Sequence, residues 1–210
     1  MPVPPSDDRQ NADRSDDRRP TGHDAPRTLV HEGPVIRVET VEYDDMGGRR
    51  VRKDVVRHPG AVTVIPIDPA GRVLMVRVGR LPVGRFLLEF CAGKLEPGED
   101  PRHAAGRELE EEVGRRAARI EPIGTYLTSP GFCDERMHAY LATGLAPVPQ
   151  RLEAGEEIEV VTLSPGEIDA AIADGRIEDG KSITAWHLVR VRFADRLTIR
   201  TPSGDSERVS

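Results

Sequence analysis

The sequence predicts an α/β protein in which helices and a mixed sheet form a sandwich, preceded by a small antiparallel β subdomain. Three observations indicate this class: short β-rich runs occur in both halves of the chain, one capped helix lies between them, and further helical segments follow near the C-terminus. A length of 210 residues suits one domain with a small accessory piece. We place the main domain at residues 58–200 and the β subdomain at residues 28–57.

The two ends of the chain lack the apolar side chains that a folded segment needs. Residues 1–27 contain six Asp, five Arg and five Pro, and hold no large apolar residue after Val3. Such a segment cannot bury enough surface to offset the entropy lost on ordering. We therefore predict a disordered tail at residues 1–27 and a flexible tail at residues 201–210.

The β subdomain is predicted from two β-rich runs, residues 35–43 and 51–57, joined by turn-forming residues at 44–48. A hairpin of this size is too small to be stable alone. We expect it to pack on the main domain or on another subunit.

The main domain is predicted to alternate strands with three helices. Expected strands are 61–67, 73–78, 86–90, 118–127, 136–142 and 158–163, and expected helices are 101–113, 164–175 and 182–193. The second helix begins with a capping box, in which Ser164 precedes a proline and Glu167 lies three residues later.

Charge and cysteine content exclude several classes of function. The chain has 30 Lys and Arg against 36 Asp and Glu, a formal net charge of −6, which argues against nonspecific nucleic-acid binding. No apolar run is long enough for a membrane helix, and the N-terminus lacks the apolar core of a secretory signal. Two cysteines, Cys91 and Cys133, cannot form a disulfide framework, so we expect a cytoplasmic protein.

The most informative stretch is GKLEPGEDPRHAAGRELEEEVG, residues 93–114. Asp100 can cap a helix that begins at Pro101, and Gly114 suits its C-terminal cap. Residues 108, 111 and 112 are glutamates and share one side of that helix, because their spacing is i, i+3, i+4.

Three carboxylates on one face repel each other. A hard divalent cation such as Mg²⁺ would offset the repulsion, since it prefers oxygen ligands and leaves room for a phosphate substrate. Arg107 could hold these ligands in place. The alternative is a solvated acidic helix face, which the glutamates alone would favour.

The spacing of all the motif residues favours a metal site over a solvated helix face, because the stretch resembles the Nudix box. This motif is G-x5-E-x7-R-E-U-x-E-E-x-G-U, where U is a bulky aliphatic residue. The matching residues are Gly93, Glu99, Arg107, Glu108, Leu109, Glu111, Glu112 and Gly114. The final aliphatic position is Arg115, which departs from the pattern. The resemblance implies a Nudix-type α/β/α sandwich with a mixed sheet.

The flanks, from about residue 35 to 189, resemble the ADP-ribose pyrophosphatase branch of that family. Pro130 stands sixteen residues after Gly114, the spacing typical of the branch. The branch's Arg-Gln-Tyr-Arg run is represented by residues 77–80, in which Arg80 is kept and Val78 and Gly79 replace Gln and Tyr. In this branch the N-terminal sheet is exchanged between two subunits, so the resemblance implies a homodimer.

The resemblance also implies residue roles. The Ala92 carbonyl, Glu108, Glu111 and Glu112 would be the metal ligands, with Glu99 and Arg107 orienting them. The substrate-binding residues would be Arg80, Arg52, Lys53, Glu89 and Pro130. Glu111 and Arg107 also belong to the expected catalytic set, which a glutamate from the loop at 153–159 would complete: Glu156 first, then Glu153.

The implied activity is hydrolysis of the pyrophosphate bond of ADP-ribose or a related nucleoside diphosphate sugar, with Mg²⁺ or Mn²⁺, giving AMP and ribose 5-phosphate. A GDP-mannose or UDP-sugar pyrophosphatase is an alternative. A non-catalytic ADP-ribose sensor is disfavoured because all the box carboxylates remain and the chain has no room for a DNA-binding module. A hydrolase of oxidised nucleoside triphosphates is a further alternative, which a Nudix box without Pro130 would have supported; this chain has Pro130.

Overall fold

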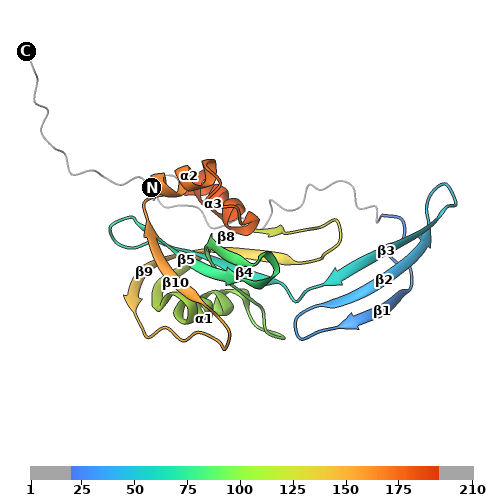
Figure 1. Cartoon of the computed structure of the whole chain (residues 1–210), viewed down its shortest axis with the longest axis horizontal. Helices are drawn as coiled ribbons and strands as arrows, with labels where there is room; N and C mark the ends of the chain where they lie inside the picture. Colours follow the sequence, from blue (N-terminus) through green and yellow to red (C-terminus); the bar gives the residue numbers. More distant parts are fainter. Residues whose placement is uncertain (1–19, 194–210) are drawn as a thin grey trace, which may run out of the picture.

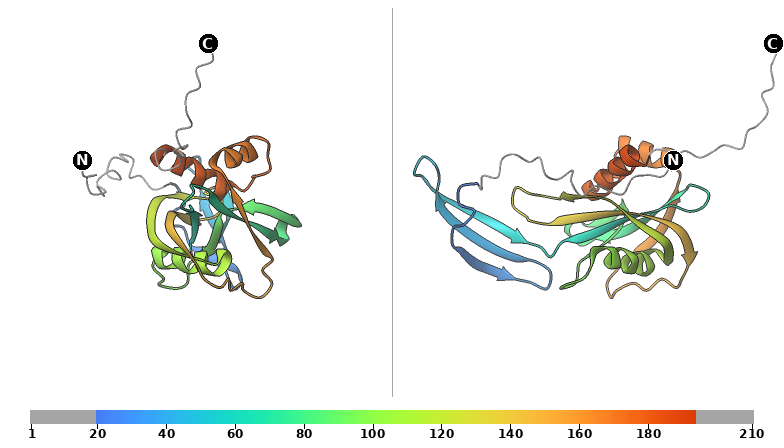
Figure 2. Two further views of the ribbon diagram at one scale, coloured as in Figure 1. Left: turned by 90° about the vertical axis from the view of Figure 1, so that its left-hand side faces the viewer. Right: turned by 180° about the vertical axis from the view of Figure 1, so that it is seen from behind.

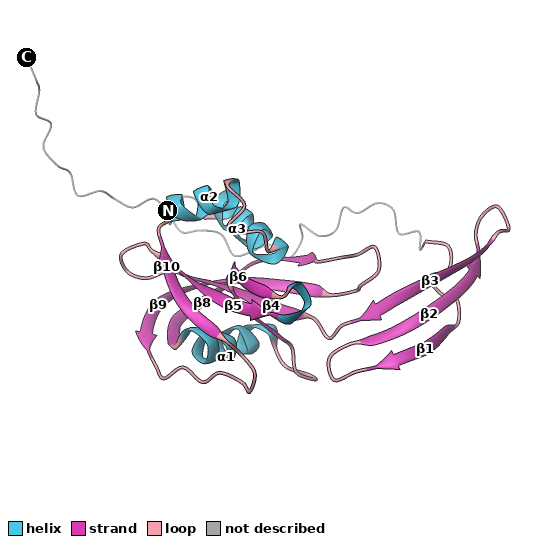
Figure 3. Cartoon of the chain, in the orientation of Figure 1, coloured by secondary structure: helices cyan, strands magenta, loops and turns pink. Residues whose placement is uncertain are grey.

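The computed structural model describes residues 20–193. Its main domain has two layers of sheet covered by helices on both outer sides (Figures 1 and 3). Helix α1 (Pro101–Val113) covers one side, and helices α2 (Pro165–Ala173) and α3 (Gly180–Arg192) cover the other. The α/β/α sandwich expected from the sequence is confirmed. No helix among the described residues is long and apolar enough to cross a membrane.

The main domain contains a four-stranded mixed sheet and a three-stranded antiparallel sheet. The first has the order β7 (Cys91–Lys94), β4 (Ala61–Pro66), β9 (Arg136–Pro147), β8 (Arg115–Leu127). The second has the order β10 (Ile158–Leu163), β5 (Val73–Arg80), β6 (Arg85–Glu89), and a short 3-10 helix, Leu81–Val83, joins β5 to β6. Strands β4 and β9 run parallel, whereas the other neighbouring pairs are antiparallel, so the sheet is mixed as predicted.

Strand β4 lies at the centre of the core and is buried along its whole length. Because side chains alternate across a strand, Val62 and Val64 pack toward α1, while Ile65 packs with Trp186 and Ile168 beneath α2 and α3. A strand buried on both faces reads as a continuous apolar run rather than an alternating one. The main domain therefore has two apolar layers, one on each side of the sheets.

Helix α1 has the bounds predicted from its capping residues. Asp100 accepts hydrogen bonds from the Arg102 and His103 amides, and Gly114 adopts φ 64°, a left-handed conformation that suits glycine. Leu109 and Val113 are buried against the sheet, with two alanines beside them. The packing of these apolar residues fixes the adjacent, glutamate-bearing side of the helix relative to the sheet.

The N-terminal region is a three-stranded antiparallel sheet with the order β1 (Arg27–Glu32), β2 (Arg37–Asp44), β3 (Arg50–Arg57). The expectation of a two-stranded hairpin was wrong, because β1 adds a third strand. Every residue of β1 is exposed, so its sequence carries no burial pattern that would reveal it. Strand β7 was also missed as a separate strand, and β8 and β9 are longer than predicted.

The predicted N-terminal tail lies outside the described residues as far as residue 19. Residues 20–26 are described as a turn and its flanks, and Arg27 begins β1. The predicted C-terminal tail, residues 201–210, lies wholly outside the described residues.

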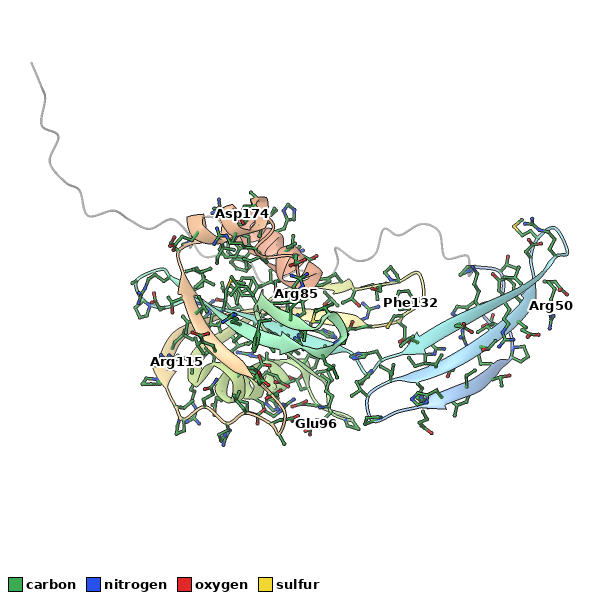
Figure 4. All side chains as sticks on the ribbon, viewed as in Figure 1. Arg50, Arg85, Glu96, Arg115, Phe132 and Asp174 are labelled. Carbon is green, nitrogen blue, oxygen red and sulfur yellow. The ribbon has the colours of Figure 1, made fainter. Side chains whose placement is uncertain are left out.

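A narrow junction joins the N-terminal sheet to the main domain, and the sheet projects away from the body (Figure 1 and the right-hand view of Figure 2). The end of β3 pairs with the loop between β8 and β9: the Val56 amide donates to the Phe132 carbonyl at 2.7 Å, and the Asp134 amide donates to the Val56 carbonyl at 3.2 Å. Figure 4 shows Phe132 on this loop, facing the sheet.

Asp134 holds this junction with both carboxylate oxygens. Arg57 Nη1 donates to Oδ2 at 2.7 Å, and the His58 amide donates to Oδ1 at 2.9 Å. Although burial acts to raise the pKa of Asp134, the hydrogen bonds from Arg57 and His58 outweigh it and leave the pKa below its usual value. The carboxylate is therefore ionised at neutral pH, where it anchors the sheet.

Replacing Asp134 by Ala should loosen the junction, because two hydrogen bonds to a charged group are lost. In the Asp134→Ala variant, we expect hydrogen–deuterium exchange of the backbone amides at positions 56 and 134 to accelerate about tenfold or more. Asp44→Ala, at the far end of the same sheet, removes an exposed acid 3.7 Å from Arg50 and should leave these rates unchanged. Equal rates in Asp134→Ala and the wild type would contradict the anchoring role.

Candidate active site

Two carboxylates on α1, Glu108 and Glu112, are buried against β7, with 8% and 6% of their surface exposed. They lie one helical turn apart and face the same side. The strand can approach them because Gly93 has no side chain: a Cβ there would lie 1.8 Å from Glu108 Oε1. The glycine of the motif is thus explained by contact with a glutamate of the same motif.

Arg107 is the cation that ties this cluster together. Its Nε and Nη2 donate to the two oxygens of Glu99 at 3.0 and 3.1 Å, and its Nη1 donates to Glu108 Oε1 at 2.8 Å and Glu111 Oε2 at 3.0 Å. Hydrogen bonding to Glu99 is the largest contribution to the raised pKa of Arg107. The loop that precedes α1 and the acidic face of α1 are therefore held by one guanidinium.

Glu112 is held by β7, because the Ala92 amide donates to its Oε2 at 3.1 Å. Burial, followed by the charge of Glu108, raises the pKa of Glu112 to about 8. Burial also raises the pKa of Glu108, against the lowering effect of Arg107. Three carboxylates, those of residues 99, 108 and 111, thus share one guanidinium that does not contact Glu112, and the buried pair of Glu108 and Glu112 lacks full charge compensation.

The cluster fits a divalent cation by its donor chemistry and its charge. Carboxylate and carbonyl oxygens are the ligands that Mg²⁺ and Mn²⁺ prefer, and the excess negative charge is buried. Within residues 20–193, no three acidic, histidine or cysteine side chains converge on one point that could hold a metal ion. Arg107 occupies oxygens of Glu108 and Glu111, so a cation would exchange with this guanidinium for those carboxylates.

The segment after β9 closes over the C-terminal end of α1. Gln150 Nε2 donates to the Glu112 carbonyl at 2.6 Å, the Arg151 amide to the Glu111 carbonyl at 3.0 Å, and the Val148 amide to the Gly114 carbonyl at 3.0 Å. These bonds satisfy carbonyls that a helix end otherwise leaves without partners. The loop that follows is thereby placed against the helix that carries the glutamates.

Of the two glutamates proposed from this loop, the structure brings Glu156 toward the buried pair. Its charge contributes to the raised pKa values of Glu108 and Glu112. Its Oε2 accepts a hydrogen bond from the Glu153 amide at 2.8 Å, which fixes the carboxylate. The Glu153 side chain is exposed and makes no comparable approach.

Arg80 and Glu89 form a second charged group beside the cluster. Arg80 Nε and Nη2 donate to the two Glu89 oxygens at 2.9 and 2.7 Å. The Arg80 side chain is 40% exposed, and Glu112 is among the charges that raise its pKa, after the hydrogen bond to Glu89. Glu89 is 1% exposed, so it lies behind Arg80 rather than at the surface of the site.

Three expected substrate-binding residues lie away from this cluster within one chain. Arg52 and Lys53 are on β3 of the projecting sheet, opposite Glu42 and Val41 of β2. Pro130 is exposed in the loop between β8 and β9, next to the junction. Arg115, which departs from the motif, donates from Nη1 to the Gly114 carbonyl at 2.9 Å, so a charged side chain caps the end of α1.

Two residues of this region, Gln150 and Lys181, were not predicted from the sequence. Gln150 donates to the backbone carbonyl of Glu112, and Lys181 approaches Glu89 from α3. Neither belongs to a motif, so no spacing signal was available for them.

The site lies within the part of the chain that matches a family model described as NUDIX domain, residues 57–186. The chain is 36% identical over 167 residues to the methanol dehydrogenase activator of Bacillus methanolicus, with 79% of this chain and 90% of the relative covered. It is 33% identical over 167 residues to the ADP-ribose pyrophosphatase of Bacillus subtilis, with the same coverage. A crystal structure described as an ADP compounds hydrolase has a TM-score of 0.72 at 22% identity, covering 81% of this chain and 93% of that chain, and shares the fold.

Charge burial at Glu112 predicts a pH-dependent stability of the metal-free chain. The unfolded chain loses the Glu112 proton near pH 4.5, whereas the folded chain keeps it up to about pH 8. The unfolded state therefore binds fewer protons in this window, and the free energy of unfolding in EDTA should fall as the pH rises through it. Glu112→Gln should remove this loss and exceed the wild type by up to roughly 4 kcal/mol at pH 8.5 in urea denaturation.

Glu110→Gln is the control for that measurement, because Glu110 is on the same helix but pairs with Arg116. It should give no gain in stability at pH 8.5. If the free energies of unfolding of the wild type and Glu112→Gln depend on pH in the same way, the fold does not raise the pKa of Glu112.

Proposed function

Because the chain belongs to the NUDIX family and is a hydrolase of that family, we propose that it cleaves the pyrophosphate bond of ADP-ribose, with Mg²⁺ as the metal, to give AMP and ribose 5-phosphate. NUDIX hydrolases are generally dependent on divalent metals. The observation that carries the proposal is the group formed by Glu108, Glu112 and Glu156 beside Arg80. It places excess carboxylate oxygens near a partly exposed guanidinium.

Glu108, Glu112 and the Ala92 carbonyl would hold the metal, with Glu111 in support. When bound, a divalent cation neutralises the diphosphate and acidifies the attacking water. Mn²⁺ would suit the same oxygen donors. Arg107 positions Glu108 and Glu111 from one side, and the Ala92 amide positions Glu112 from the other.

The remaining residues act on substrate and proton. Glu156 would accept the proton of the attacking water, and its hydrogen bond from the Glu153 amide keeps the carboxylate in place for this. Water attacks one phosphorus in line, the bridging P–O bond breaks, and the other phosphate leaves with the bridging oxygen. Arg80 would bind the diphosphate.

Replacing Glu112 or Glu156 by Gln should abolish most of the activity, since one removes a metal ligand and the other a general base. We expect kcat for AMP release from ADP-ribose with Mg²⁺ to fall by about 10² to 10⁴ in each variant. Glu110→Gln, on the same helix but outside the cluster, should retain kcat.

Two outcomes would redirect the proposal. Efficient hydrolysis of GDP-mannose or UDP-glucose, with a kcat/KM above that for ADP-ribose, would assign the alternative substrate class. Tight ADP-ribose binding without turnover in Mg²⁺ or Mn²⁺ would indicate a sensor.

We also propose that the active form is a homodimer joined through the N-terminal sheet. Most of this sheet is exposed, including the apolar residues Leu29, Val30, Val35 and Ile36, and only Thr40 and Val41 are buried in it. A three-stranded sheet with so little burial gains stability from a partner. Exchange between subunits would bring Arg52 and Lys53 of one chain to the site of the other.

A double replacement, Leu29→Glu with Val30→Glu, should break this dimer by placing charges in its apolar face. Sedimentation equilibrium should find a dimer for the wild type and a monomer with reduced activity for the variant. Glu substitutions at Met46, an exposed apolar residue in the β2–β3 turn, should leave the mass unchanged. A fully active wild-type monomer would refute the dimer.

Both thiols, the buried Cys91 and the partly exposed Cys133, are free. This is consistent with the reducing cytoplasm that we propose as the location.

A further inference from the structure

Lys181, the second residue of α3, reaches the buried Glu89 carboxylate at Oε2, the oxygen that also accepts a hydrogen bond from Arg80 Nη2. Its Nζ contacts Glu89 Oε2 and lies 3.0 Å from Asp179 Oδ2. The Lys181 side chain is only 14% exposed. Two carboxylates and two cations, those of residues 89, 179, 80 and 181, therefore form one electrically balanced group.

This group is anchored to the core at the start of α3. Asp179 Oδ2 accepts hydrogen bonds from the Ser182 amide at 3.0 Å and the Ser182 hydroxyl at 2.6 Å, and Ser182 Oγ accepts from the Phe90 amide at 2.9 Å. Tyr126 adds a bond from its hydroxyl to the Lys181 carbonyl at 2.7 Å. Lys181 therefore sits at a fixed place behind the site, with little freedom to move.

The balance of charges determines where Arg80 lies. Burial acts to raise the pKa of Glu89, but hydrogen bonding to Arg80 and the charge of Lys181 overcome it, so the carboxylate stays ionised. Arg80 uses Nε and Nη2 for Glu89, and within the described residues its Nη1 donates no hydrogen bond. Without Lys181, Arg80 would be the one cation left to neutralise both Glu89 and Asp179.

We propose that Lys181 is a positioning residue, which neutralises Glu89 and Asp179 from behind so that Arg80 keeps its Nη1 edge available to the substrate diphosphate. This inference rests on the function proposed above, in which Arg80 binds that diphosphate. Lys181 itself does not contact the substrate. Its removal would draw the guanidinium toward Asp179 and weaken substrate binding more than the chemical step.

Steady-state kinetics with ADP-ribose and Mg²⁺ test this. Lys181→Met should raise KM about tenfold and change kcat less than threefold, because a charge-assisted contact made in the ground state is lost. Lys181→Arg should restore KM. In an Arg80→Met background, Lys181→Met should raise KM no further, because the two residues act through the same contact.

Arg190→Met is the matched control, since it removes a cation from the same helix that pairs with Asp169 outside this group. It should leave KM unchanged. A folded Lys181→Met with wild-type KM, or effects of Lys181→Met and Arg80→Met that add fully, would overturn the inference. If Lys181→Met does not fold, Lys181→Gln keeps a donor for Glu89 without the charge and should show the same rise in KM.

The outcomes separate this inference from the proposed function. A wild type that releases no AMP refutes the proposed function, whereas normal turnover with an unaffected Lys181→Met refutes only the role of Lys181. A crystal structure of Lys181→Met needs no substrate: the Arg80 guanidinium should be displaced toward Asp179, and an unmoved guanidinium would count against the inference.

Discussion

The rest of the structure depends on the burial of two like charges, those of Glu108 and Glu112, on one face of a single helix. Burial and mutual repulsion both disfavour the ionised pair. The chain maintains the arrangement because Leu109 and Val113, on the adjacent side of α1, pack into an apolar layer. The free energy of that packing offsets the cost of removing the carboxylates from water. The buried negative charge of the site is then not fully compensated.

The surrounding elements compensate part of this negative charge and fix the positions of the glutamates. Strand β7 supplies an amide to Glu112 and a glycine that admits Glu108, and Arg107 links the preceding loop to the helix. The segment at 148–151 caps the end of α1 and so brings Glu156 into the same group. Backbone amides and the Arg107 and Gln150 side chains together set the relative positions, which suits a site that must hold its shape.

What could be predicted from the sequence was local or belonged to a motif. Asp100, Pro101 and Gly114 define α1 through capping chemistry that acts over a few residues. The spacing of the glutamates identified the cluster that the structure assembles. The pairing of Glu89 with Lys181 spans 92 positions, and no pattern along the chain encodes it. Strand β1 was not predicted for a related reason. It is held by backbone pairing to β2, which any exposed sequence can make.

Arg107 bears on whether the chain can fold before it binds a metal ion. Its guanidinium already bridges three carboxylates, so the acidic face has an internal counterion before any cofactor arrives. Under the proposed function, the chain could therefore fold first and bind its metal ion afterwards. Under the proposed function, loss of a bound metal ion would return the pocket to this form, in which Arg107 compensates part of the acidic charge, rather than begin unfolding of the chain.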